Sequence, residues 1–119
     1  MTTTTLPSPV SAYVEATNSF NLDGFVALFD DDALVNDHRD EFIGKERIRA
    51  WAAREIIGYR VVLKIVNQRV VGNHVALKAE VDGDFDKKGL PSPLVLAFYF
   101  CLSGDKISAL VIVNNKTAS

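Results

Sequence analysis

The residues best placed to do chemistry are Asp37 and His38, which directly follow a short apolar stretch, residues 33–35. A strand over this stretch would deliver the carboxyl group of Asp37 to the strand end, before the polar run 39–41 turns back toward a helix. An acid held there among apolar walls can act as a proton-transfer group. The alternative is a solvated turn, because acids are common in turns.

The acids between two predicted strands resemble the start of a calcium loop, but the residues that follow them do not fit one. Asp82, Asp84 and Asp86 have the spacing of the start of such a loop. Lys87 stands where the loop needs glycine, and Pro93 stands where it needs the closing glutamate. We therefore predict no metal site here, and nothing in the sequence predicts a cofactor.

The second histidine and the only cysteine are expected to have no chemical role. His74 shares one face of a predicted strand with Lys78 and Glu80, which indicates a surface position, and the two histidines lack a zinc-site spacing. Cys101 lies in the most apolar run, residues 94–102, where a buried thiol is more common than a nucleophile. The sequence also lacks the GxSxG, GxGxxG and GxxxxGK motifs of serine hydrolases, dinucleotide-binding domains and phosphate loops.

Length and composition predict one small domain. The chain has 119 residues, 48% of them hydrophobic, which is enough for one core with a cavity. We expect a disordered, Thr-rich tail over residues 1–7 and a single domain over residues 8–117. The net charge of -2 argues against binding to nucleic acid or to an anionic membrane, so a small molecule or a protein is the expected partner. No signal peptide or membrane-spanning run is recognisable, and a cytoplasmic protein is expected.

Three helical patterns occupy the first half of the chain. The first covers residues 8–18, and the second starts at Asn21 as its N-cap and ends at the acids 30–32, which oppose the helix dipole. The third lies between Gly44 and Gly58. On its apolar face Glu55 stands in register with Ile48, Trp51 and Ala52.

The second half of the chain predicts an antiparallel sheet. From Tyr59 the apolar period becomes two, with Tyr59, Val61, Leu63 and Ile65 on one face. A turn at residues 72–73 leads to a second strand, and a hairpin turn at residues 103–105 joins the last two. Helices followed by strands predict an α+β fold.

The order of these elements, together with three segments, resembles a known superfamily. The segments are NLDGFVALFDDDALVND, FIGKERIR and SGDKISALVIV. They are similar to the ketosteroid isomerase branch of the nuclear transport factor 2-like (SnoaL-like) superfamily. The resemblance implies a cone with three N-terminal helices packed on a strongly curved, mainly antiparallel sheet that encloses an apolar pocket. It also implies a homodimer formed through the sheet.

The resemblance implies a catalytic base at Asp37 and an oxyanion donor at Tyr13. The family's second oxyanion donor, a protonated aspartic acid, falls on Ala97, which has no polar side-chain atom. Losing one such donor costs about 3 to 4 kcal/mol of transition-state stabilisation, so ordinary steroid isomerisation is not expected. Strand alternation puts Tyr99 on the face of Ala97 and Val95, where its hydroxyl could replace the missing acid.

Three functions follow from the resemblance. The first is an isomerase- or cyclase-type enzyme that removes a proton alpha to a carbonyl of an apolar cyclic substrate, with His38 as an auxiliary acid or orienting partner. Its pocket walls would be Phe25, Phe29, Trp51, Val61, Leu63, Phe85, Val95 and Ala97. The second is a non-catalytic ligand-binding or protein-interaction domain. The third, an epoxide hydrolase, requires an acid-arginine-acid array, and Lys78 and Glu80 lack a second acid beside them.

Overall fold

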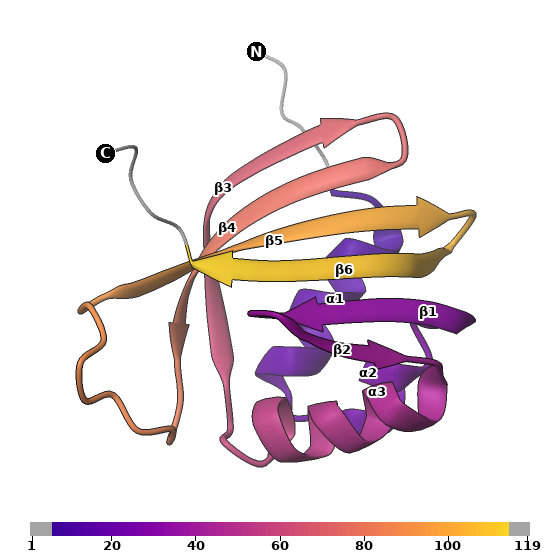
Figure 1. The fold of residues 1–119 in the computed structure, drawn as a ribbon. Coiled ribbons are helices and arrows are strands. Elements are labelled where there is room, and N and C mark those ends of the chain that lie inside the picture. The colour runs from indigo at the N-terminus through magenta and orange to yellow at the C-terminus, as the bar shows by residue number, and fades with distance from the viewer. Residues whose placement is uncertain (1–5, 115–119) are drawn as a thin grey trace.

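The computed structural model describes residues 6–114 and shows three α-helices before most of the sheet (Figure 1). Much of the predicted tail, residues 1–7, and the end of the predicted domain, residues 8–117, lie outside the described residues. The helices are α1 (Ser8–Asn18), α2 (Leu22–Val26) and α3 (Lys45–Trp51), and a π-helical segment, η1 (Ala52–Ile57), continues α3. Within residues 6–114, no helix is both long and apolar enough to cross a bilayer.

Six strands form one mixed sheet. They are β1 (Phe29–Asp37), β2 (Asp40–Ile43), β3 (Val62–Val71), β4 (His74–Asp82), β5 (Leu94–Ser103) and β6 (Lys106–Asn114). Their order in the sheet is β2-β1-β6-β5-β4-β3. β1 and β6 are parallel, and the other neighbouring strands are antiparallel. The predicted α+β architecture with a mainly antiparallel sheet is confirmed.

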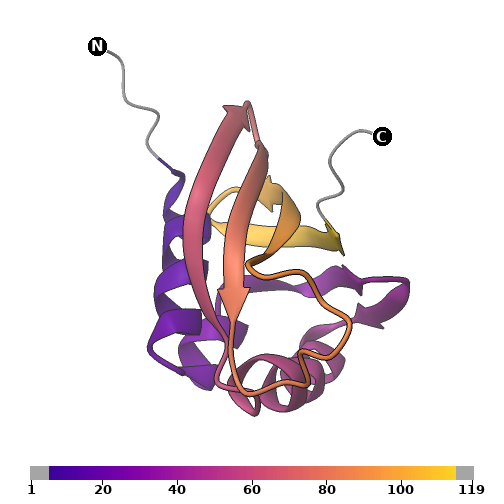
Figure 2. The same ribbon diagram turned by 90° about the vertical axis from the view of Figure 1, so that its left-hand side faces the viewer.

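The sheet bends strongly around the helices. In Figure 2, β3 and β4 rise steeply beside α1, whereas β1 and β2 run across the lower part of the molecule. Register irregularities interrupt β1 between Phe29 and Leu34, β3 between Ile65 and Asn67, and the β5–β6 pairing at its turn end. Bulges of this kind bend a strand and increase its twist, which curves the sheet.

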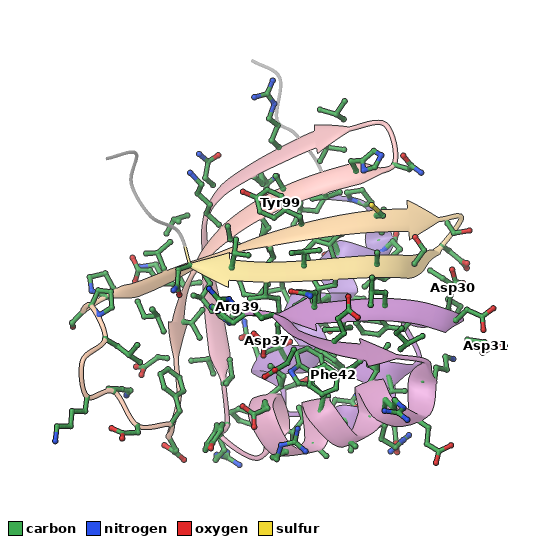
Figure 3. The ribbon with its side chains drawn as sticks, viewed as in Figure 1. Asp30, Asp31, Asp37, Arg39, Phe42 and Tyr99 are labelled. Atoms are coloured by element: carbon green, nitrogen blue, oxygen red, sulfur yellow. The ribbon has the colours of Figure 1, made fainter. Side chains whose placement is uncertain are left out.

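The second helix is shorter than predicted, and its end was placed wrongly. α2 ends at Val26, and Phe29 already pairs with Ile107 of β6. The acids 30–32 therefore lie in the irregular part of β1 rather than at a helix end; Figure 3 labels two of them at the outer end of the strand. Asn21 does cap the helix, because its side chain accepts a hydrogen bond from the backbone N–H of Gly24 at 3.0 Å.

The core fills the space between the helices and the concave face of the sheet. Its largest buried side chains include Trp51, Tyr13, Phe25, Phe29 and Phe100. The end of α1 is fixed to β3 by Asn18, whose side chain donates to the carbonyl oxygen of Leu63 at 3.1 Å and accepts from the Leu63 N–H at 2.7 Å. These two bonds hold α1 across the sheet, and α1 carries Tyr13.

Candidate active site

A cavity of about 400 Å³ lies on the concave side of the sheet, within the size range of small-molecule sites. It is lined by residues of α1, η1, the end of β1, the 83–93 loop and the strands β3, β4, β5 and β6. Most of its wall is apolar, including Val61, Leu63, Leu96, Phe98 and Ile112. Asp37, His38 and Tyr13 all line it, so the structure brings together three residues that the sequence predicted for one site.

Asp37 is the last residue of β1, and both of its carboxyl oxygens have partners. Oδ2 accepts a hydrogen bond from the indole Nε1–H of Trp51 at 3.0 Å, and Oδ1 lies 2.6 Å from Nδ1 of His38. The side chain is 22% exposed. A carboxylate has about four acceptor positions. Two remain available after these contacts, so Asp37 is held in place and can still take a proton.

His38 is positioned by an unusual hairpin turn between β1 and β2. The two turn residues, His38 and Arg39, have φ angles of 53° and 94°, a conformation that two-residue hairpins require and that asparagine and glycine adopt more easily. The His38 N–H donates to the carbonyl oxygen of Ile112, and its ring Nε2 lies 3.1 Å from Oδ1 of Asn114. A protonated imidazolium can donate to Asp37 and Asn114 together. His38 thus joins the carboxylate to the end of β6.

Tyr13 lies deep in the structure, 1% exposed, and is surrounded by aromatic rings. The centroid of its ring is 4.9 Å from that of Phe25 and 5.1 Å from that of Phe100. Its hydroxyl has no hydrogen-bond partner among residues 6–114 and belongs to a residue that lines the cavity. Burial, and then the negative charge of Asp37, raise the pKa of Tyr13 above its usual range. The hydroxyl therefore stays protonated and can donate to a ligand.

Three of the predicted pocket walls lie beneath the cavity rather than in its lining. Phe25, Phe29 and Trp51 are each 0% exposed and are not lining residues. The phenylalanines pack against Tyr13, and Trp51 bonds to Asp37. These residues position the site instead of contacting a ligand directly. Val61, Leu63 and Phe85 do line the cavity, as predicted.

The residues of β5 that the sequence predicted as pocket lining lie on the opposite face of the strand. The residues of β5 that line the cavity are Leu94, Leu96 and Phe98, so Val95, Ala97 and Tyr99 face outward. Tyr99 is 47% exposed and lies in front of the sheet in Figure 3, with α1 behind it, so its hydroxyl cannot replace the missing acid. The inner position is held by Phe98, which also lacks a polar atom. The site therefore has no acidic donor on β5.

The sequence interpretation missed several lining residues. Glu55 and Tyr59 come from η1 and the turn after it, and Asn114 ends β6. A signal existed for Glu55, because it is an acid in register with the apolar face of its helix. No comparable signal marked Asn114, a polar residue at a strand end.

Comparison with known proteins identifies the family. The profile of the SnoaL-like domain matches residues 10–110, which is most of the chain. The chain belongs to the SnoaL-like family. No curated protein sequence matches this SnoaL-like chain.

Solved structures of the same fold support this assignment. A candidate polyketide cyclase from Sinorhizobium meliloti is 26% identical to this SnoaL-like chain, with a TM-score of 0.81 over 91% of this chain and 95% of the other. A protein with a ketosteroid isomerase-like fold from Catenulispora acidiphila, in complex with trimethylamine, is 27% identical, with a TM-score of 0.77 over 92% and 86%. A candidate ketosteroid isomerase from Kribbella flavida, at 11% identity and a TM-score of 0.75 over 93% and 78%, shares the fold.

Proposed function

We propose that this protein is a small-molecule enzyme of the isomerase or cyclase type that removes a proton alpha to a carbonyl group. The observation that carries the proposal is that Asp37 and Tyr13 line the same apolar cavity. A carboxylate and a neutral hydroxyl at one site supply the base and the oxyanion donor that enolisation needs.

In the proposed step, the Asp37 carboxylate takes the proton from the alpha carbon. The electron pair of the broken C–H bond forms the enolate, and the negative charge develops on the carbonyl oxygen. The Tyr13 hydroxyl donates a hydrogen bond to that oxygen. If the protonated Asp37 exchanges with deuterated solvent, transfer of a deuteron to the same carbon gives hydrogen–deuterium exchange, and transfer of the proton to a conjugated carbon gives isomerisation. Trp51 and His38 hold the carboxylate in place through their contacts with its two oxygens.

The apolar wall supports an apolar, ring-containing substrate. Leu96, Phe98 and Ile112 offer no hydrogen bonds, so recognition depends on shape and on the polar groups near Asp37. A single oxyanion donor favours ketones whose alpha protons are already acidic. Removing one donor from an oxyanion hole typically lowers the rate roughly 100-fold to 1000-fold.

The test is hydrogen–deuterium exchange at the alpha carbon of a panel of cyclic ketones, followed by NMR. The native chain is expected to accelerate exchange of at least one ketone, and Asp37→Asn is expected to abolish the acceleration. Asp40→Asn is the matched control, because Asp40 is an exposed aspartate of the same hairpin that does not line the cavity. Equal exchange rates for native and Asp37→Asn chains would reject Asp37 as the base.

A non-catalytic ligand-binding domain is the second candidate. It is favoured by Phe98, which leaves the cavity without an acidic oxyanion donor on β5. In that case apolar ketones would bind with measurable affinity but would exchange at the same rate with and without the protein.

The homodimer implied by the resemblance also stays a proposal. Val62, Val66 and Tyr99 are large, exposed apolar residues of β3 and β5, and a partner could cover them. Light scattering of the native chain and of Tyr99→Lys would test it; a native monomer would contradict the proposal.

A further inference from the structure

The charged groups that line the cavity are mostly negative. Asp37 and Glu55 both line it, and no lysine or arginine does so among residues 6–114. The one basic residue in the lining, His38, is bound to Asp37. A ligand carboxylate or phosphate would therefore meet two carboxylates and no lysine or arginine among the lining residues within 6–114.

Glu55 lies at the solvent-exposed rim of the cavity. Exposure separates the buried lining residues from those at the rim: Tyr13 is 1% exposed and Phe98 3%, whereas Tyr59 and the side chain of Glu55 are 38% exposed. The side chain of His38 is 40% exposed and lies at the rim as well. The ring of Tyr59 meets the ring of Phe85 edge to face, with centroids 6.4 Å apart. The 83–93 loop approaches this end of η1 (Figure 2), and the Asp84 N–H donates to the Tyr59 carbonyl oxygen at 2.7 Å.

The lysines and arginines near Glu55 lie outside the cavity lining. Arg54 contacts Oε2 of Glu55 at 3.0 Å, but it is 59% exposed and is not a lining residue. Arg54 therefore offsets the charge of Glu55 from the solvent side, where water and salt screen the pair. Lys64 and Lys87 line a neighbouring cavity, where Lys87 is paired with Asp82 at 2.6 Å. The Nζ of Lys87 also lies 5.7 Å from the ring centroid of Phe85, so the Phe85 ring already has a cation beside it.

We propose that the substrate is an apolar carbonyl compound that also carries a cationic amino group. This inference rests on the proposed function for the position of the carbonyl, next to Asp37 and Tyr13. The cationic group would lie at the rim, close to the Glu55 carboxylate and the ring of Tyr59. Carboxylates and aromatic faces both attract ammonium groups, and both are present there.

The test uses three 4-phenylbutan-2-ones that differ only in the para substituent: trimethylammonio, tert-butyl or carboxylate. The trimethylammonio and tert-butyl groups have nearly the same shape, and two methylenes insulate the carbonyl from the charge. Binding is measured at low salt through the fluorescence of the single tryptophan, Trp51, which contacts Asp37. The variants are Glu55→Gln and its control Glu46→Gln, which removes the same charge from an exposed position outside the cavity.

We expect the cationic probe to bind at least roughly tenfold more tightly than the anionic probe, because the two probes meet the acidic lining with opposite signs. Glu55→Gln should weaken the cationic probe about three- to fivefold, as for an exposed charge pair, and should change the neutral probe less than about twofold. Glu46→Gln should leave all three affinities unchanged.

Two results would overturn the inference: equal binding of the cationic and anionic probes, or an equal effect of Glu55→Gln on the cationic and neutral probes. Alpha-proton exchange of the same three ketones tests the proposed function separately. Charge-selective binding without exchange would keep this inference and reject catalysis. Exchange without charge-selective binding would support catalysis and reject this inference.

Discussion

Tyr13→Phe separates a catalytic role of the hydroxyl from a structural one. The substitution removes one oxygen atom and keeps the ring, so the contacts with Phe25 and Phe100 remain. The hydroxyl has no partner among residues 6–114, so its loss breaks no hydrogen bond within that part of the chain. The free energy of unfolding should change by less than about 0.5 kcal/mol, because the usual cost of an unsatisfied partner does not arise.

The same substitution should have a large effect on the reaction. If the hydroxyl stabilises the enolate oxygen, its loss should lower the rate of alpha-proton exchange roughly 100-fold to 1000-fold. Urea unfolding and exchange followed by NMR measure the two quantities on one sample. Tyr99→Phe is the matched control, since Tyr99 lies on the outer face and should change neither.

The reasoning would be refuted by the opposite pattern. A loss of stability above about 1.5 kcal/mol, with exchange unchanged, would mean that the hydroxyl makes a structural hydrogen bond. It would then be unavailable to a substrate.

Three further predictions concern stability. Trp51→Phe removes the N–H donor to Asp37 Oδ2, so the free energy of unfolding in urea should fall by about 1.5 to 3 kcal/mol, and an unchanged value would show that this bond contributes nothing. Asn21→Ala removes the cap of α2 and should cost about 1 kcal/mol in the same assay, whereas no loss would remove the cap's role. The raised pKa of Tyr13 means that the folded chain retains this proton where the unfolded chain loses it. The contribution of this proton to the free energy of unfolding is therefore fully present below pH about 10. Above that pH it declines by up to about 1.4 kcal/mol per pH unit. Denaturation curves from pH 9 to 11 should be steeper in pH for the native chain than for Tyr13→Phe, and equal slopes would contradict the pKa shift.

The architecture was predictable because its signals are local and repeat along the chain. The helix spacing in α1, the Asn21 cap and the period of two after Tyr59 each indicated an element that the structure contains. The prediction failed at the end of α2, where a local signal and the pairing of a distant strand disagreed. The acids 30–32 oppose a helix end, but pairing of Phe29 with Ile107 had already placed this segment in the sheet.

The face of β5 could not be predicted from its sequence. Residues 94–102 are apolar at nearly every position except Tyr99, so the pattern does not show which set of alternate residues faces the core. A shift of one residue moves every side chain to the other face. The resemblance assigned the inner position to Ala97, and the structure gives it to Phe98.

The site was predicted in part. The resemblance supplied Asp37 and Tyr13, and both line the cavity. The contacts of Asp37 with Trp51 and His38 join residues whose placement depends on the tertiary fold, and no spacing in the sequence encodes them. Asn114 enters the site for the same reason, because it lies 76 residues from His38 in the chain.

The central claim is that Asp37 and Tyr13 act on one bound substrate in the same transition state. The most direct test is a double-mutant cycle on alpha-proton exchange of one cyclic ketone, with Asp37→Asn, Tyr13→Phe and the double variant. Residues that act together in one step have strongly non-additive effects. We predict that the double variant exchanges no more slowly than Asp37→Asn alone. Rate losses that multiply independently, or no loss in Asp37→Asn, would contradict the claim.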